Sequence, residues 1–308
     1  MRKQLCDALV ARSANPQMVF LTGDLGFMAL EPLQLAMGPR FINAGVAEQN
    51  MVSVAAAMAK EGLETWVYSI APFCYARSFE QIRNDIAFHG LPVKLIGNGG
   101  GYGYGVMGPT HHAIEDYGVL LTLPAMRVFT PVFDEDISEV VRRVGESASV
   151  GYLRLGRGEP PYGFEVPAYA PWRQLTDGPG MPVIAVGPLA GTYIEAFEKV
   201  TPEERPNLWA LAELPMELDQ APVRLMAQIA ASGAVCVVEE HVQQGGVAAQ
   251  LALQMASTGR PVTVRSLHAR AHNYGRYGSQ RFMRERSGLA PERVLECLLG
   301  ESRPHGHA

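Results

Sequence analysis

Glu48 stands at the start of a segment whose composition predicts a buried helix. The segment 52–59 consists mainly of alanine, valine and methionine, and side chains of these types are usually buried. A carboxylate at such a place must cap the helix, pair with a cation or take up a proton. The alternative, which assigns Glu48 no catalytic role, is a glutamate at a helix N-terminus that the helix dipole favours.

Two adjacent histidines, His111 and His112, lie in the segment Gly-Pro-Thr-His-His-Ala-Ile-Glu-Asp at 108–116. Adjacent side chains point in different directions on a helix or a strand, and zinc sites space their histidines by three or more residues. We therefore expect no metal here. Two readings remain: a polar loop before a helix from Ala113 to Leu121 with Thr110 as its cap, or one histidine facing a substrate oxyanion or hydroxyl.

The segment 97–105 is rich in glycine, and two phenylalanines precede it in the chain. Its pattern matches neither GxxxxGK[ST] nor a GxGxxG that opens a helix, so a nucleotide site is not indicated. Glycines at this density favour close approach of the backbone to a ligand or a neighbouring subunit. Phe73 and Phe79 could stack on a ring with a polar edge or could belong to the core.

Composition limits the class of protein. The chain has 308 residues, 47% apolar and 19% charged, with a net charge of -5. This length is enough for two globular domains, and the charge predicts binding neither to nucleic acid nor to a membrane. No two cysteines form a CxxC pair, which argues against zinc and a redox dithiol and favours the reducing cytoplasm. The first residues lack the apolar core of a signal peptide.

Short apolar segments alternate with helical ones in the first half of the chain. The strands that we expect there are 18–22, 66–70, 92–97, 127–130 and 151–155, with helices at 46–61 and 78–88. This alternation predicts an α/β fold, a mostly parallel sheet covered by helices on both faces. Functional groups in such sheets gather at the carboxyl ends of the strands, and Asp24, Phe73 and the loop 97–112 follow strand ends.

The second half shows the same alternation of strands and helices after a stretch rich in proline and glycine. We expect strands at 183–187, 208–211 and 235–239, again in an α/β arrangement. The prediction is therefore a first domain at 1–162, a linker at 163–180 and a second domain at 181–308.

Four motifs resemble, in this order, the transketolase family of thiamine diphosphate enzymes. They are GDLG at 23–26, GVAEQNM at 45–51, F…R…EQIRNDI at 73–86 and GPTHHAIED at 108–116. The resemblance implies a pyrimidine-binding domain, which holds the aminopyrimidine ring of the cofactor, followed by a transketolase C-terminal-like domain. The segment Glu239-Glu240-His241, with glycines at 245 and 246, resembles a structural signature of that second domain.

The resemblance also implies roles for residues at the cofactor. Glu48 corresponds to the glutamate that shares a proton with N1′ of the aminopyrimidine, and Phe73 to an aromatic residue that stacks on the ring. Phe79, Arg77 and Asp24 are the other cofactor-binding candidates.

At the substrate, His111 corresponds to a histidine over the reacting carbon, and Arg157 and Arg2 to arginines that contact a substrate phosphate. Two positions depart from the family. Many relatives carry aspartate before GPTH and histidine at the start of the glycine-rich loop, where this chain has Met107 and Gly99. A modified or non-phosphorylated donor is therefore an open alternative.

The GDG…N motif that holds the diphosphate and its Mg²⁺ (or Ca²⁺) in this superfamily is absent from the sequence. The resemblance thus implies one subunit of a split transketolase, with a separate diphosphate-binding partner in an α2β2 assembly. The activity implied is transfer of a two-carbon ketol unit from a ketose to an aldose. The alternatives are the β subunit of a 2-oxoacid dehydrogenase E1 and a non-catalytic homologue that only assembles.

Overall fold

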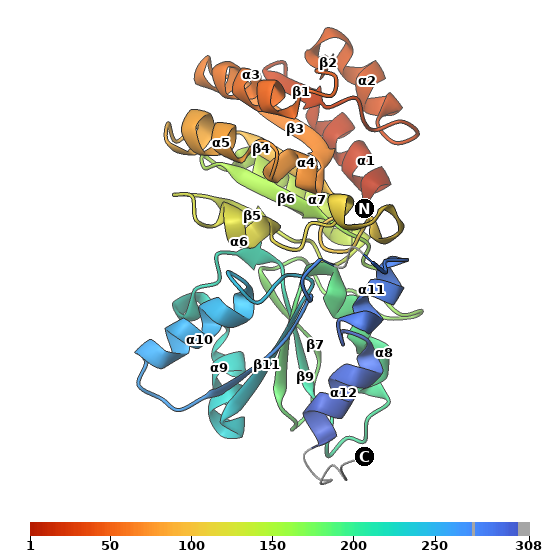
Figure 1. Ribbon diagram of the computed structural model, residues 1–308, viewed down its shortest axis with the longest axis vertical. Helices are drawn as coiled ribbons and strands as arrows, with labels where there is room; N and C mark the ends of the chain where they lie inside the picture. Colours follow the sequence, from red (N-terminus) through yellow and green to blue (C-terminus); the bar gives the residue numbers. More distant parts are fainter. Residues whose placement is uncertain (273–274, 301–308) are drawn as a thin grey trace.

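Two sheets lie one above the other along the long axis of the molecule (Figure 1). A computed structural model describes residues 1–272 and 275–300; residues 301–308, at the end of the second domain expected from the sequence, lie outside the described residues. The strands of the first sheet are β1 Met18–Thr22, β2 Phe41–Asn43, β3 Glu64–Ile70, β4 Lys94–Asn98, β5 Arg127–Phe129, β6 Gly151–Leu155 and β10 Glu213–Leu214. Their order is β10-β5-β6-β4-β3-β1-β2, and only β10 is antiparallel to its neighbour.

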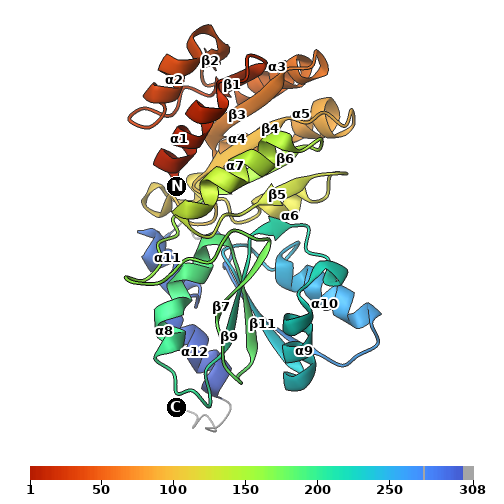
Figure 2. The same cartoon turned by 180° about the vertical axis from the view of Figure 1, so that it is seen from behind.

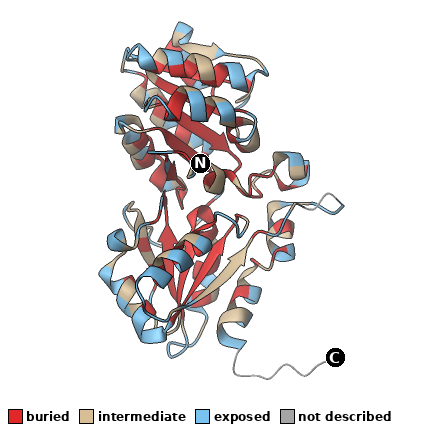
Figure 3. Ribbon diagram, turned by 60° about the vertical axis from the view of Figure 1, so that its left-hand side comes forward, coloured by how far each residue is buried: buried red, intermediate tan, exposed pale blue. Residues whose placement is uncertain are grey.

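Helices cover both faces of this first sheet. They are α1 Arg2–Arg12, α2 Glu31–Met37, α3 Glu48–Lys60, α4 Ala71–Tyr75, α5 Phe79–Gln81, α6 Asp116–Leu120 and α7 Ile137–Glu146. The apolar sides of α1, α2 and α7 pack on one face, which Figure 2 brings to the front, and α3 and α4 pack on the other. Because both faces are covered, β1, β4 and β6 are buried along their whole length (Figure 3).

The second sheet has the order β12-β11-β8-β9-β7, in which only β7 is antiparallel. Its strands are β7 Trp172–Thr176, β8 Pro182–Val186, β9 Asn207–Leu211, β11 Ala234–Glu239 and β12 Thr263–His268. Its helices are α8 Ile194–Glu198, α9 Val223–Ser232, α10 Val247–Ser257, α11 Gln280–Arg286 and α12 Pro291–Leu299. The predicted α/β class is thus confirmed for both halves of the chain.

Three expectations about individual elements need correction. The helix expected at 78–88 consists of α5 and a π-helical turn, Ile82–Ala87. Within this turn the Asp85 carboxylate accepts a 2.5 Å hydrogen bond from Ser53 on α3. The helix expected from Ala113 begins only at Asp116. The stretch 163–180, expected as a linker, contains strand β7, and β10 from the second half of the chain extends the first sheet.

A buried arginine joins the two halves. Arg154 on β6 donates from Nε to Asp116 at 2.7 Å, and its Nη2 donates to the carbonyls of Ala113 and Glu240 at 3.0 and 2.9 Å. Tyr152 adds a hydrogen bond to Asp116 at 3.1 Å. Because Glu240 follows a strand of the second sheet, Arg154 ties that sheet to the loop that precedes α6.

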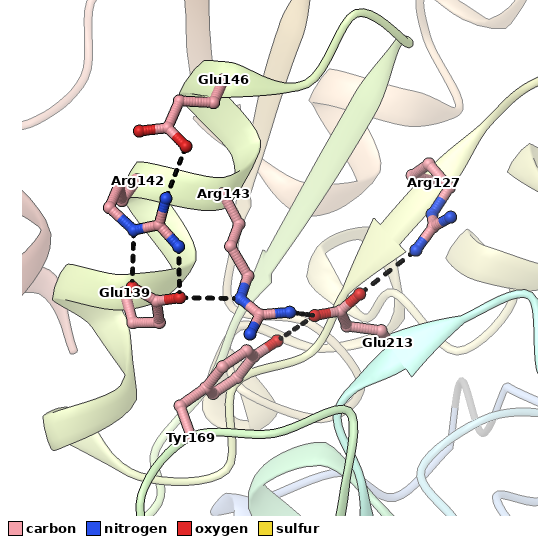
Figure 4. Close-up of polar contacts among 7 residues, drawn as sticks. All are labelled: Arg127, Glu139, Arg142, Arg143, Glu146, Tyr169 and Glu213. Carbon is pink, nitrogen blue, oxygen red and sulfur yellow. Dashed lines mark hydrogen bonds and ion pairs between the residues drawn. The ribbon is translucent and has the colours of Figure 1, made fainter. Parts of the chain in front are cut away.

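A second polar network joins α7 to β10 and to the segment before β7 (Figure 4). Glu213 accepts hydrogen bonds from Arg127, Arg143 and Tyr169, at 3.2, 3.2 and 3.0 Å. Glu213 is buried, and it holds β10 and the loop around Tyr169 against the first sheet. Beyond it, Glu146 pairs with an exposed arginine on the surface of α7.

Replacement of Asp116 by asparagine should destabilise the protein strongly. The substitution keeps the shape of the side chain but leaves the guanidinium of Arg154 buried without an anion, which costs about 3–5 kcal/mol. Urea unfolding followed by circular dichroism measures the difference. Glu146→Gln, which removes only an exposed ion pair, is the matched control and should have no measurable effect. Equal stability of the two variants would show that the buried pair does not stabilise the fold.

Candidate functional site

Strands β1, β2, β3, β4 and β6 run parallel, so their carboxyl ends meet at one edge of the first sheet. The predicted site residues Asp24, Glu48, Phe73, Gly99 and Arg157 each follow one of these strands. The topology therefore brings together side chains that are far apart in the sequence.

Glu48 is the first residue of α3 and is 1% exposed. Its Oε2 lies 2.6 Å from Nη1 of Arg77, and its Oε1 lies 3.4 Å from the hydroxyl of Ser69. The carboxylate makes no capping hydrogen bond within its own helix. Of the three possibilities for a buried carboxylate, the structure thus shows pairing with a cation.

Arg77 connects Glu48 to the aromatic residues of the site. Its guanidinium lies over the ring of Phe73, 4.4 Å from the centroid. The Phe73 ring in turn meets the ring of His111 edge-on, with centroids 5.1 Å apart. Glu48, Arg77, Phe73 and His111 thus form one continuous chain of contacts.

Asp24 lies in the turn that follows β1, beside Glu48. It has a positive φ of 56°, and the Asn43 side chain accepts from its backbone N–H at 3.1 Å and donates to its carboxylate at 2.8 Å. A Cβ on the neighbouring Gly23 would lie 3.5 Å from Glu48, so the backbone of this turn passes close to the buried carboxylate. The Asp24 side chain itself is exposed.

The two histidines of the GPTHH segment diverge. His111 faces Phe73, and its Nδ1 lies 3.0 Å from the hydroxyl of Thr110. His112 is 2% exposed, and its Nε2 donates to the Gly105 carbonyl at 3.1 Å. Thr110 caps no helix, so the reading of this segment as a simple capped helix start is wrong.

A pocket of about 430 Å³ opens beside Tyr104, whose ring centroid lies 6.2 Å from that of His111. Its lining includes Arg2, Arg157 and Gly99, three of the residues expected at the substrate, together with Tyr104 and Val106. The pocket therefore combines two arginines with two carboxylates, Asp134 and Glu159, together with glycine backbone and one phenol. Asp134 pairs with the N-terminal amine at 2.7 Å, and the two guanidinium groups can bind an anion that carries polar groups. Met107 is 54% exposed and stands outside this lining.

Phe79 occupies a different place from the other cofactor candidates. It packs against the core and lines a separate hollow of about 490 Å³ with Tyr75, Glu115 and His272. In that hollow Glu115 accepts from Tyr75 at 3.1 Å and lies 2.5 Å from His272. Neighbouring groups, chiefly His272, hold the pKa of Glu115 below its usual value although burial opposes this shift.

Three residues that the sequence did not single out lie at the site. Ser69, at the end of β3, contacts Glu48, and Cys74 is fully buried nearby, where burial and the charge of Glu48 raise the pKa of its thiol to about 12. Tyr104 lines the pocket with the arginines. Only Tyr104 carried a signal in the sequence, as a tyrosine within the glycine-rich loop.

The acidic pair of the second half has a structural role. Glu239, at the end of β11, accepts from the backbone N–H groups of Val247 and Ala248 at 2.8 and 3.0 Å and from the hydroxyl of Tyr117 at 2.5 Å. It therefore accepts hydrogen bonds from N–H groups at the start of α10 that have no partner within the helix. Glu240 pairs with Arg284 on α11, in agreement with the structural reading of this segment.

Neither a cluster of metal ligands nor a membrane span occurs in the described part of the chain. No group of three or more His, Cys, Asp or Glu residues is placed to hold a metal ion at 1–272 or 275–300. Over the same residues, no helix has the length and apolar character needed to cross a membrane.

Comparison with known proteins agrees with this geometry. The family model for the transketolase pyrimidine-binding domain matches residues 9–161. One of the subunits of the apulose-4-phosphate transketolase of Phocaeicola vulgatus is 27% identical over 270 residues, which cover 85% of this chain and 86% of that one. A transketolase family protein of Sinorhizobium fredii is 30% identical over 264 residues, which cover 82% of this chain and 74% of that one.

A solved structure described as a split gene transketolase, in an inactive beta4 tetramer, has a similar fold. The TM-score is 0.81, the identity is 28% and the match covers 98% of each chain. Together with the order of the site residues along the sheet edge, these similarities define the chain as the pyrimidine-binding half of a thiamine enzyme. The chain belongs to the transketolase family.

The buried His112 should make stability depend on pH. Burial lowers its pKa below the ordinary value, so the unfolded chain binds the proton more readily than the folded one between these two pKa values. Stability should therefore fall as the pH drops through the ordinary histidine pKa. Urea unfolding between pH 7.5 and 5 should show a shallower loss for His112→Gln than for the wild type.

The matched control for this experiment is His89→Gln, which changes an exposed histidine and should leave the pH dependence of the wild type intact. An identical pH dependence for the wild type and His112→Gln would contradict the assignment.

Proposed function

We propose that this protein is one subunit of a split, thiamine diphosphate-dependent transketolase. It transfers a two-carbon ketol unit from a ketose donor to an aldose acceptor and is active only with a separate subunit that binds the diphosphate. The observation that carries the proposal is the chain of contacts from the buried Glu48 through Arg77 and Phe73 to His111, beside a pocket with two arginines.

The residues present fit the aminopyrimidine end of the cofactor. Such a ring has apolar faces and a polar edge, and Phe73 offers a half-exposed ring face while Glu48 offers a carboxylate. The guanidinium of Arg77, which is planar and carries N–H donors, already lies on both groups. These two contacts support the proposal, because a flat, nitrogen-rich ring could make the same ones; Asp24 lies in the turn next to them.

Thiamine diphosphate, when bound, supplies the nucleophilic carbon and the electron sink of the reaction. The task of Glu48 is to hold a proton at the ring nitrogen N1′, as a side chain positioned within hydrogen-bond reach of that nitrogen can do. Phe73 orients the ring. His111, half-buried between Phe73 and Tyr104, donates a hydrogen bond to the oxygen on the reacting carbon of the substrate.

The pocket supports a phosphorylated substrate. Arg157 and Arg2 provide guanidinium donors suited to a phosphate, and a relative is described as an apulose-4-phosphate transketolase. Met107 offers only an apolar surface where hydroxyl recognition is expected. We therefore infer a sugar phosphate whose hydroxyl pattern differs from that of ordinary transketolase donors.

The partner in this proposal is a diphosphate-binding transketolase subunit that also holds Mg²⁺ (or Ca²⁺), in an α2β2 assembly. Exposed apolar side chains support a protein surface here, since Phe27, Met28 and Val46 are 85%, 83% and 77% exposed on the loops around Asp24 and Glu48. We place the assembly in the cytoplasm, because the cysteines are free thiols and three of the four are buried.

Glu48→Gln tests the role of the carboxylate. Glutamine keeps the shape but cannot share a proton with N1′, so kcat of the assembled enzyme should fall by about 10²–10⁴-fold. Exchange of the C2 proton of the bound cofactor for deuterium, followed by NMR in the assembled complex, should slow in parallel. Glu61→Gln, at the exposed far end of the same helix, is the control. Unchanged exchange in Glu48→Gln would remove Glu48 from the mechanism.

Met107→Asp tests whether position 107 takes part in recognition of the donor sugar. The new carboxylate can accept hydrogen bonds from donor hydroxyls, so kcat/KM for ordinary ketose phosphates should rise roughly tenfold relative to the native donor. The measurement is kcat/KM over a panel of donors with both variants in the assembled enzyme. Leu253→Asp, at an exposed position of α10, controls for the added charge. A wild type that already prefers xylulose 5-phosphate strongly, with that preference untouched by Met107→Asp, would contradict this account.

A further inference from the structure

Tyr104 lies on the wall of the arginine pocket and carries the next inference, which rests on the proposed function. Its ring centroid is 6.2 Å from that of His111. It lines the same pocket as Arg2 and Arg157. Tyr104 thus adjoins both His111 and the pocket that carries the two groups proposed to hold a phosphate.

The backbone of the glycine-rich loop fixes the place of this ring. Gly99 has a φ of +77°, and a Cβ built on it would overlap with the ring of Tyr104. A Cβ on Gly103 would lie 2.7 Å from the Cα of Gly99, so the loop folds back tightly on itself. Gly99 cannot carry a side chain while the ring is in place, and Gly103 cannot carry one while the loop is folded in this way. At this wall of the pocket the loop therefore presents the side chain of Tyr104.

The hydroxyl of Tyr104 accepts a hydrogen bond from a buried side chain of the sheet. Asn98, the last residue of β4 and 7% exposed, donates from Nδ2 to the phenol oxygen at 2.6 Å. In this hydrogen bond the phenol accepts, so its own hydrogen remains to be donated. No acceptor for that hydrogen lies within hydrogen-bonding distance among the residues that the structure describes. A phenol that already accepts a hydrogen bond is a stronger donor.

We propose that Tyr104 determines substrate specificity by donating a hydrogen bond to a neutral hydroxyl of a sugar phosphate. The phosphate would lie against Arg2 and Arg157, and the hydroxyl would lie between the phosphate and the carbon that faces His111. The arginines supply the charge that the phosphate requires, whereas a neutral phenol matches a neutral oxygen. The sugar is thereby recognised separately from its phosphate.

The test uses the isolated chain, because Arg2, Tyr104 and Arg157 and the rest of the lining that the structure describes belong to it. Binding of D-ribose 5-phosphate and of inorganic phosphate is measured by NMR titration for the wild type and for Tyr104→Phe, which keeps the ring over Gly99 and removes only the hydroxyl. The wild type should bind the sugar phosphate more tightly than phosphate. Tyr104→Phe should weaken ribose 5-phosphate binding roughly fivefold to tenfold and leave phosphate binding unchanged.

Two further variants serve as controls. Arg157→Ala should weaken both ligands, since it removes a contact to the phosphate itself. Tyr162→Phe, which removes a hydroxyl from a fully exposed tyrosine, should change neither.

Three results would overturn the proposal: equal loss for both ligands in Tyr104→Phe, no loss for either, or a wild type without preference for the sugar phosphate. Equal loss would mean that Tyr104 holds the phosphate or supports the loop. The titration needs neither cofactor nor partner subunit, so its failure is distinct from failure of the proposed transferase activity, which cofactor exchange in the assembled complex measures.

Discussion

The site depends on one interaction, the ion pair between the buried carboxylate of Glu48 and the guanidinium of Arg77. Glu48 opens a helix whose inner face is alanine, valine and methionine, and 1% of it is exposed. A carboxylate in such surroundings is costly unless a cation or a hydrogen-bond donor meets it. Arg77 supplies the cation and, because it also lies on Phe73, aligns the carboxylate with the aromatic ring.

The rest of the molecule holds this arrangement in place. Parallel strands bring the side chains to one sheet edge. The loop that carries His111 is braced from the second sheet, since Arg154 donates to both Ala113 and Glu240, and Tyr102 donates to the carbonyl of Arg270 at 3.2 Å. The second half of the chain therefore contributes to the site by supporting the loop between β4 and α6.

The sequence predicted the α/β class and most strands of both sheets, because buried parallel strands are continuous apolar runs between helices. It was less informative where tertiary contacts override local pattern. The segment 113–115 has helical character in sequence, yet Gly101 pairs with Ala113 as an isolated bridge, and α6 starts only at Asp116. Strand β7 escaped prediction because it is a short edge strand in a stretch rich in proline and glycine.

At the site, motif order pointed to Glu48, Phe73 and His111, and the structure places them in one chain of contacts. The sequence could not show that Arg77 lies on Glu48 and Phe73 at once, since that depends on how α3 and α4 face each other. It also could not show that the Tyr104 ring covers Gly99, because the relation exists only in the folded loop.

The central claim is that this chain supplies one half of a thiamine diphosphate site and that a second subunit supplies the other. Calorimetric titration of thiamine diphosphate with Mg²⁺ tests it most directly, first into this chain alone and then into its mixture with a transketolase subunit that carries GDG…N. The account predicts weak binding by the chain alone, and tight binding with ketol transfer by the mixture. Tight binding by the isolated chain, or no gain on mixing, would contradict it.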